Sequence, residues 1–334
     1  MQTLLTIIKW ILAGLVGLLL LLVIGSTIYH RLRIPSEEVA YPPPGQLVAV
    51  NGHRLHVYAE GTGDLTLVFF SGSGTTAPAL DFKGLYCLLS DNYRTVVVER
   101  AGYGWSDEGG TSRDIETVLN ETRQALTSAG ESPPYVLLPH SMGALEAIHW
   151  ANRHPKEVTA IIGLDPAVPP IYEIMPSERM MVAVASFIGR TGLLRLAPSI
   201  CLESPAASYL TEAEMSAYCS IMVRRTLTAD MRAEVEAVQA NARRVAAEGM
   251  PDVPFYALIS NGDGVPVDSW REVLAAYVEA AGGQYKMLDV GHHLYAQAPH
   301  LIAKDIRAFL QEPSDSVSLH KTKGLRQEAR WGGS

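Results

Sequence analysis

A strand, a sharp turn and a helix follow one another in residues 135–150, YVLLPHSMGALEAIHW, and this stretch constrains the fold more than any other. The apolar run ends abruptly at HSMG, and a pattern of helical spacing follows. A serine at such a turn projects its hydroxyl above the sheet edge, where the next helix also directs its free N–H groups. Ser141 is therefore a candidate nucleophile, and the competing interpretation is a serine that only caps a helix.

The turn is tight enough to require small residues two positions before and two positions after the serine. Gly143 meets this requirement, whereas Pro139 occupies the position where glycine is usual. Proline fixes its own φ and removes an N–H group from the strand end. The motif alone does not decide between nucleophile and cap, so the rest of the chain must supply the other parts of a hydrolase.

Length, charge and cysteine content limit the classes of protein. The 334 residues suffice for one large α/β domain with an insertion or for two ordinary domains. A formal net charge of -8 argues against a nucleic-acid partner, since the chain has no excess of cations to neutralise phosphates. Cys87, Cys201 and Cys219 show no metal-ligand spacing. We interpret them as buried free thiols and leave a bridge between Cys201 and Cys219 open.

The N-terminal segment predicts a membrane span. Residues 10–29 carry no charged side chain, and a helix of this length measures about 30 Å, which matches a bilayer core. We interpret residues 1–33 as a single-pass anchor that contacts lipid through residues 4–29. The alternative is a signal peptide with a weak cleavage site before Ser26.

The flanks of this span leave its orientation open. Lys9 lies on one side and Arg31 and Arg33 on the other, so the comparison of positive charges is nearly balanced. Residues 34–46 include YPPPG, which predicts a stiff linker that is neither helix nor strand. The globular domain is expected to begin after it.

Strand and helix patterns then alternate, which predicts a mostly parallel sheet covered by helices on both faces. An NG turn at residues 51–52 joins the first two strand patterns into a hairpin. The expected strands lie at 47–50, 54–60, 66–71, 94–99, 159–164, 255–260 and 284–289, with a central strand from residue 135. The expected core helices lie at 112–129, 268–281 and 299–311, with one more ending near 154.

The alternation breaks after the sixth strand pattern. Residues 168–250 are largely helical and rich in Ala, Met and Arg, with no good strand, and we interpret them as an inserted cap. The cap divides the core into residues 47–167 and 251–312. The polar tail, residues 313–334, is expected to be disordered.

Four further motifs occur in the order that a serine hydrolase requires. The SGSG turn after the third strand frees backbone N–H groups at a strand end, which makes Ser73 and Met142 the expected donors to an oxyanion. The sequence ERAGYGWS at residues 99–106 ends the next strand in a glycine-rich turn. NGDG then places Asp263, and VGHH places His292, at neighbouring edges of the sheet.

This order of motifs resembles the α/β-hydrolase superfamily, in the cap-bearing branch that includes monoacylglycerol lipases and bacterial esterases. The resemblance covers residues 47–310. It implies that His292 takes the proton of Ser141, that Asp263 orients the imidazole, and that water hydrolyses an acyl enzyme without a metal or organic cofactor. Epoxide hydrolase and dehalogenase relatives carry an aspartate at the serine position, so their chemistry is disfavoured. The departures from the family pattern are Pro139, Ser71 and Gln297.

Three aspartates compete for the role of the acid. Asp263 lies between two glycines, has no obvious capping task and matches the usual acid position of the family. Asp165 ends the strand at residues 159–164, where some relatives place their acid, and Asp268 is expected to cap a helix. We assign the role to Asp263 and keep Asp165 and Asp268 as alternatives.

Together these features predict a membrane-anchored serine hydrolase of carboxylic esters with apolar acyl groups. Gly72 and His140 are expected to contact the substrate beside the nucleophile, and Met175 and Phe187 of the cap are expected to line a pocket over Ser141. The alternatives are an amidase, aminopeptidase or acyltransferase with the same triad, and a ligand-sensing homologue that hydrolyses slowly or not at all. The oligomeric state is left open.

Overall fold

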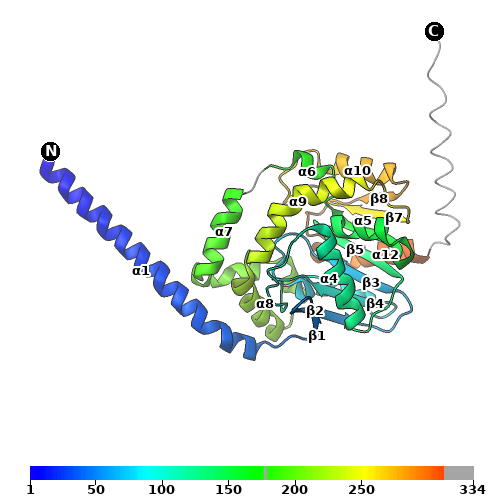
Figure 1. Cartoon of the computed structure of the whole chain (residues 1–334), viewed down its shortest axis with the longest axis horizontal. Coiled ribbons are helices and arrows are strands. Elements are labelled where there is room, and N and C mark those ends of the chain that lie inside the picture. The colour runs from blue at the N-terminus through cyan, green and yellow to red at the C-terminus, as the bar shows by residue number, and fades with distance from the viewer. Residues whose placement is uncertain (177–178, 312–334) are drawn as a thin grey trace, which may run out of the picture.

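A computed structural model describes residues 1–176 and 179–311, and an eight-stranded sheet with helices on both faces forms its centre (Figure 1). The strand order is β1-β2-β4-β3-β5-β6-β7-β8. The pairs from β4 through β8 are parallel, whereas β1 and β2 add antiparallel to one edge. The predicted, mostly parallel sheet is thus confirmed. The predicted disordered tail lies outside the described residues.

The strands lie close to the ranges that the sequence predicts. They are β1 (Gln46–Val50), β2 (His53–Glu60), β3 (Thr66–Phe70), β4 (Arg94–Glu99), β5 (Tyr135–Ser141), β6 (Val158–Pro166), β7 (Phe255–Ile259) and β8 (Gln284–Met287). Asn51 and Gly52 join β1 and β2 with φ values of 48° and 88°. Two left-handed residues in succession are what an NG hairpin turn requires, so the predicted hairpin is confirmed.

Two apolar layers cover the sheet. Along β3, Val68 and Phe70 point into one layer and Leu67 and Phe69 into the other, because successive side chains of a strand alternate between faces. Helices α4 (Ile115–Ser128), α5 (Gly143–Arg153) and α10 (Trp270–Ala280) contribute to the first layer. Helices α3 (Lys83–Leu89), α11 (Leu294–Gln297) and α12 (Pro299–Gln311) contribute to the second. The short helix α2 (Pro78–Asp81) is buried, and η1 (Pro155–Glu157) connects α5 to β6 without a buried residue.

The chain between β6 and β7 is helical. Its elements are α6 (Ile171–Ile174), α7 (Arg179–Thr191), η2 (Leu193–Leu196), η3 (Pro198–Glu203), η4 (Pro205–Tyr209), α8 (Glu212–Arg225) and α9 (Ala229–Ala247). Thr211 begins α8 with a capping box that includes Glu214, and the Thr228 side chain caps α9. Such caps satisfy N–H groups that a helix start leaves free, so each helix has a defined beginning.

The cysteines differ from the prediction of buried free thiols. Cys201 of η3 and Cys219 of α8 form a disulfide, and Cys87 is free and exposed. The folding of η3 back onto α8 brings the two Cα atoms within 5.2 Å, a proximity that their spacing in the sequence does not reveal.

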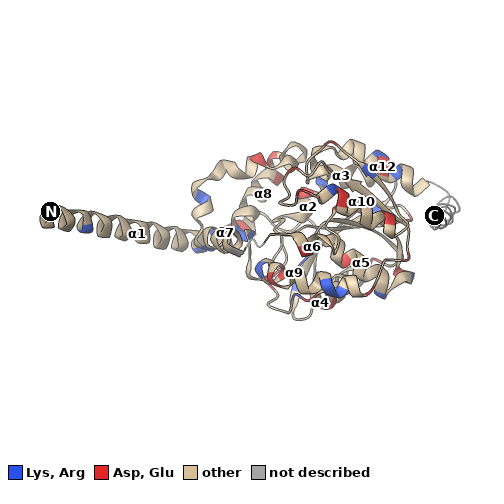
Figure 2. Ribbon diagram, turned by 90° about the horizontal axis from the view of Figure 1, so that it is seen from above, with Lys and Arg blue, Asp and Glu red and all other residues tan. Residues whose placement is uncertain are grey.

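The N-terminal helix, α1 (Gln2–Ala40), projects far from the globular part (Figure 1). Among the described residues it is the one helix that is long and apolar enough to cross a membrane. Figure 2 shows that it carries few charged residues until it approaches the cap. The helix continues through Pro35 to Ala40, so the prediction that a linker begins at residue 34 is wrong, and residues 41–45 connect α1 to β1. Its last turns are held by Glu37, which accepts two hydrogen bonds from Arg195 of η2.

Candidate active site

Ser141 occupies the sharp turn that the sequence predicts. It is the last residue of β5 and has a φ of 49°, a left-handed value that is uncommon for a residue with a side chain. A Cβ atom at Gly143 would lie 2.8 Å from Cβ of Phe70, so glycine is required where α5 leaves the sheet. Pro139 pairs with Phe70 of β3, and this departure from the usual motif does not prevent the turn.

His292 lies in the loop after β8 and is bound to Asp165. Its Nδ1 atom is 2.6 Å from Oδ2 of Asp165, which lies near the end of β6. The other carboxylate oxygen accepts hydrogen bonds from the backbone N–H of Ser260 at 2.9 Å and from Nε1 of Trp270 at 3.0 Å. Asp165 is fully buried and has a left-handed φ of 54°. These three partners compensate for the burial of the carboxylate and aim one oxygen at the imidazole.

The structure contradicts the prediction that the Asp263 carboxylate orients His292. Asp263 is exposed, and Oδ2 of its side chain accepts a hydrogen bond from Asn261. Only its backbone carbonyl contacts His292, whose N–H donates to it at 2.9 Å. The NGDG turn projects the side chain into solvent, whereas the end of β6 places Asp165 beneath the histidine. One signal in the sequence favours Asp165: it interrupts an apolar strand, where a carboxylate needs buried partners.

The glycine-rich loop after β3 lies directly against the serine. A Cβ atom at Gly72 would be 2.9 Å from Cβ of Ser141, so the loop backbone makes a close approach that glycine alone permits. Ser73 follows in this loop, and Met142 is the N-cap residue of α5. The first N–H groups of a helix have no partner within the helix. Ser73 follows the glycine that lies against Ser141, and Met142 directly follows Ser141 at the start of α5. Both predicted oxyanion donors therefore lie in backbone segments next to the serine.

His140 contacts the backbone and the ring of His292 in the loop after β8. It is buried, its Nε2 atom lies 3.1 Å from the backbone oxygen of His292, and its ring centroid is 4.6 Å from that of His292. Burial, together with the charges of His292 and His293, holds the pKa of His140 well below its usual value. A neutral ring with its proton on Nε2 donates to the His292 carbonyl. The buried His140 ring therefore contacts the backbone of His292, which differs from the predicted contact with the substrate.

Phe187 does not line a pocket over the serine, which contradicts the prediction. Its side chain is 53% exposed on α7, and Met180 and Val184 share this exposed face. Ser186 and Gly189 form the buried side of the helix. An amphipathic period alone does not tell which neighbour an apolar face meets, and here that face points outward.

Met175 lines the large cavity under the helical segment. The cavity has a volume of about 770 Å³ and is bounded by Tyr172, Met175, Pro176, Val182, Ala183, Arg232, Val235, Glu236, Val238 and Gln239. A second cavity of about 30 Å³ lies next to Met142, and Val238 borders both. Val238 thus separates the large cavity from the small one, and only the small cavity is lined by Met142, the residue that follows the candidate nucleophile.

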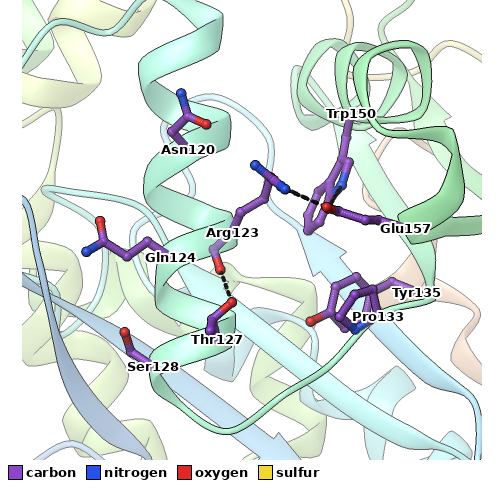
Figure 3. A pocket seen from close by; sticks show the side chains of 9 residues that line it. All are labelled: Asn120, Arg123, Gln124, Thr127, Ser128, Pro133, Tyr135, Trp150 and Glu157. Carbon is purple, nitrogen blue, oxygen red and sulfur yellow. Dashed lines mark hydrogen bonds and ion pairs between the residues drawn. The ribbon is translucent and has the colours of Figure 1, made fainter.

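A separate pocket of about 370 Å³ lies beside α4, and Arg123 and Thr127 are among the residues that line it (Figure 3). Tyr135, at the start of β5, and Glu157, just before β6, line it. The Arg123 guanidinium is bound to Glu157, so the pocket has no free charge from this pair. At about 3.3 Å per residue, the length of β5 separates Tyr135 from Ser141 by roughly 20 Å, and this pocket is not part of the site.

Comparisons with known proteins agree with the α/β-hydrolase fold. A protein family described as serine aminopeptidase, S33, matches residues 65–305. The uncharacterized protein YbdG of Bacillus subtilis (strain 168) is 33% identical over 323 residues, which cover 93% of this chain and 99% of YbdG.

Solved structures show the same fold at lower sequence identity. Cfl2 from Burkholderia cenocepacia has a TM-score of 0.64 at 20% identity, covering 79% of this chain and 94% of that one. The carboxylesterase CesB (YbfK) from Bacillus subtilis has a TM-score of 0.58 at 15% identity, covering 87% of this chain and 100% of that one. At such identities the likeness concerns the fold alone.

Proposed function

Because this chain belongs to the serine aminopeptidase, S33, family of α/β-hydrolases, we propose that it cleaves carboxylic esters through an acyl enzyme on Ser141. The observation that carries the proposal is the 2.6 Å contact between Nδ1 of His292 and the buried carboxylate of Asp165. This contact stands beside a serine with a left-handed backbone at the carboxyl end of the neighbouring strand. A serine, a histidine and a carboxylate in chain order Ser…Asp…His are the parts of an acyl-transfer triad.

The roles of the three residues follow from which of their atoms already take part in a hydrogen bond. Asp165 accepts a hydrogen bond from the Nδ1–H group of His292, so Nε2 is left to take the proton of the Ser141 hydroxyl. Oγ of Ser141 then attacks the ester carbonyl, and His292 returns the proton to the leaving alcohol. A water molecule, activated by the same histidine, hydrolyses the acyl enzyme and restores the serine.

The negative charge that forms on the carbonyl oxygen needs fixed donors. The backbone N–H groups of Ser73 and Met142 are our candidates, since Gly72, the residue before Ser73, lies against Ser141, and Met142 directly follows Ser141. Such preorganised donors lower the barrier because they need no rearrangement as the charge develops.

We further propose that α1 anchors the protein in a membrane and that the substrate has an apolar acyl group. Leu15, Leu19 and Leu22 are among the many exposed apolar side chains of α1. A helix segment of about 20 apolar residues is long enough to cross a bilayer. The cavity between α6, α7 and α9 includes Met175, Val182 and Val235, which suit the acyl group.

Labelling with a fluorophosphonate probe tests the enzyme proposal. The wild-type protein should be labelled and should release p-nitrophenol from p-nitrophenyl butyrate, whereas Ser141→Ala should do neither. His292→Gln should abolish turnover while the protein keeps its melting temperature within a few degrees. Equal labelling of wild type and Ser141→Ala would refute the role of the serine.

An aminopeptidase is the second candidate, and one residue favours it. Glu236 lines the large cavity and could bind the amino terminus of a peptide. Arg232, one helical turn before it on α9, lines the same cavity and offsets this charge. Comparing amino-acid p-nitroanilides with p-nitrophenyl esters decides between the two, and a higher kcat/KM for the anilides would favour the aminopeptidase.

A further inference from the structure

A buried guanidinium links the loop beside Ser141 to a helix of the inserted segment. Arg100 follows β4 and is 5% exposed. Its Nη1 donates to the backbone oxygen of Ser71 at 3.0 Å, and its Nη2 donates to that of Gly72 at 3.3 Å. The two carbonyl groups belong to the glycine-rich loop that lies against the serine.

The same guanidinium is bound by a carboxylate of α9. Its Nε and Nη2 atoms lie 3.0 and 3.3 Å from the two oxygens of Glu234. The Tyr103 hydroxyl donates to Glu234 at 2.6 Å, and the guanidinium carbon lies 4.5 Å from the centre of the Tyr103 ring. Arg100, Tyr103 and Glu234 are all buried, so solvent screens these contacts little.

Peptide geometry connects this pair to the oxyanion site. The carbonyl of Gly72 and the N–H of Ser73 belong to one planar, trans peptide unit and point in opposite directions. A donor that fixes the Gly72 oxygen therefore also fixes the direction of the Ser73 N–H. A cation at the oxygen polarises the unit as well, and hydrogen bonds that polarise one another become stronger.

We propose that Arg100 positions and polarises the Ser73 N–H and that Glu234 holds Arg100 in place. The position of α9 relative to the core therefore controls the geometry of the oxyanion site. This inference rests on the proposed acyl-transfer function. Arg100 and Glu234 are positioning residues and do not touch the substrate. Because Glu234 belongs to α9, which lines the large cavity, a shift of α9 would reach the loop through the buried pair of Glu234 and Arg100. A second buried carboxylate, Glu146 of α5, lies 3.9 Å from Nη1 of Arg100 and does not depend on α9.

The decisive measurements are turnover and the affinity for a transition-state mimic. Arg100→Lys keeps the charge but loses the fork that reaches two carbonyls and a carboxylate. It should lower kcat for p-nitrophenyl butyrate by about 10- to 100-fold, with KM changed less than about twofold. The inhibition constant of butylboronic acid should rise in parallel, because its adduct with Ser141 is a tetrahedral anion that places one boronate oxygen in the oxyanion site.

Glu234→Gln gives a second, nearly isosteric variant that remains informative if Arg100→Lys does not fold. It should change kcat and boronate affinity in the same direction by about tenfold. The double variant should be no slower than Arg100→Lys alone, because Glu234 acts through Arg100.

Glu121→Gln is the matched control. Glu121 pairs with Arg113, and this pair is buried to a degree similar to that of Arg100 and Glu234. Neither Glu121 nor Arg113 has a hydrogen bond to the backbone of Ser71 or Gly72. Its melting temperature should fall like that of Glu234→Gln, while kcat and boronate affinity stay within about twofold of wild type.

Three outcomes are distinguishable. Loss of melting temperature in Arg100→Lys and Glu234→Gln, with kcat and boronate affinity unchanged, would overturn the inference and leave a merely structural ion pair. A change in KM alone would overturn it too. A wild-type protein that neither hydrolyses p-nitrophenyl butyrate nor reacts with a fluorophosphonate would refute the proposed function, and the inference with it.

Discussion

Asp165 has three hydrogen bonds and no exposed surface, whereas the Asp263 carboxylate faces solvent beside Asn261. We therefore predict that Asp165→Asn lowers kcat for p-nitrophenyl butyrate by about 10⁴-fold. An amide nitrogen facing Nδ1 of His292 requires the tautomer with its proton on Nε2, which cannot accept the serine proton.

Asp263→Asn serves as the control for this change. It should keep kcat within about threefold of wild type, since only its backbone oxygen contacts His292. Melting temperatures of both variants separate loss of turnover from unfolding. Normal turnover in Asp165→Asn with an inactive Asp263→Asn would reverse the assignment.

The buried carboxyl group of Asp81 makes the stability of the protein depend on pH. Burial raises the pKa of Asp81 to about 7 from an ordinary 3.8, against the lowering effect of the hydrogen bond from Tyr218 of α8. Between these values the folded protein holds a proton that the unfolded chain has lost. The contribution of Asp81 to stability is therefore complete below about pH 4 and falls as the pH rises through about 7.

Asp81→Asn should remove this pH dependence and keep an acceptor for Tyr218. Relative to wild type, the variant should lose less free energy of unfolding between pH 5 and pH 8, by an amount on the order of a few kcal/mol. The free energy of unfolding of the variant should still depend on pH to some extent, because burial also raises the pKa of Glu146 to about 7. Denaturant titrations at pH 5 and pH 8 measure the free energy of unfolding of both proteins. An equal change between the two pH values in wild type and variant would contradict the raised pKa of Asp81.

At the scale of elements, α1 has two parts with different partners. Its apolar residues are exposed, but His30 and Glu37 are buried against the helical segment. Arg195 donates to both of these residues, with its Nη1 and Nη2 atoms 2.6 and 2.9 Å from the Glu37 carboxylate. The last turns of α1 therefore belong to the globular part of the protein.

We predict that proteins beginning at His30 and at Tyr41 differ in stability. The first should remain soluble without detergent and keep the melting temperature of the full chain. The second leaves Arg195 half-buried without its carboxylate, which should cost about 3 kcal/mol of unfolding free energy. Sedimentation and thermal unfolding provide the readouts, and equal stability of the two proteins would argue against the docking of α1.

The disulfide between Cys201 and Cys219 ties η3 to α8 across a separation of 18 residues. Closing a loop of this size removes entropy from the unfolded chain, so Cys219→Ser should lower stability by about 2–4 kcal/mol. Cys87→Ser is the matched control, since this thiol is free and exposed, and it should have no measurable effect. A free-thiol count of three in the unfolded, unreduced protein would show that the disulfide does not form.

For the molecule as a whole, the sequence predicts the sheet and the position of the candidate nucleophile, because both depend on local patterns. Apolar strands alternating with helices dictate a parallel sheet, and a turn that needs glycine at position 143 places Ser141 at its edge. The pairing of His292 with Asp165 depends on how the loop after β8 meets the end of β6 in space, and the local pattern around Asp165 indicates only that its carboxylate needs a buried partner, not which one. The exposure of Phe187 is not predictable either. The spacing of apolar residues along a helix identifies an apolar face but does not tell whether that face meets a cavity or points outward.

The contact between core and inserted segment suggests what selects the acyl chain. The large cavity lies between α6, α7 and α9, and the small one reaches Met142 and Arg100. Val238 borders both cavities and packs against the apolar core. An acyl group that extends from Ser141 into the large cavity would have to pass this side chain.

Val238→Phe should therefore change chain-length preference without changing the chemistry. Hydrolysis of p-nitrophenyl acetate should stay within about threefold of wild type, whereas kcat/KM for the decanoate should fall by about tenfold or more, because a filled passage excludes the longer chain. Val184→Phe adds the same volume on the exposed face of α7 and should leave both esters unchanged. A parallel loss of acetate and decanoate hydrolysis in Val238→Phe would indicate a distorted site, and an unchanged decanoate rate would mean that the acyl chain takes another path.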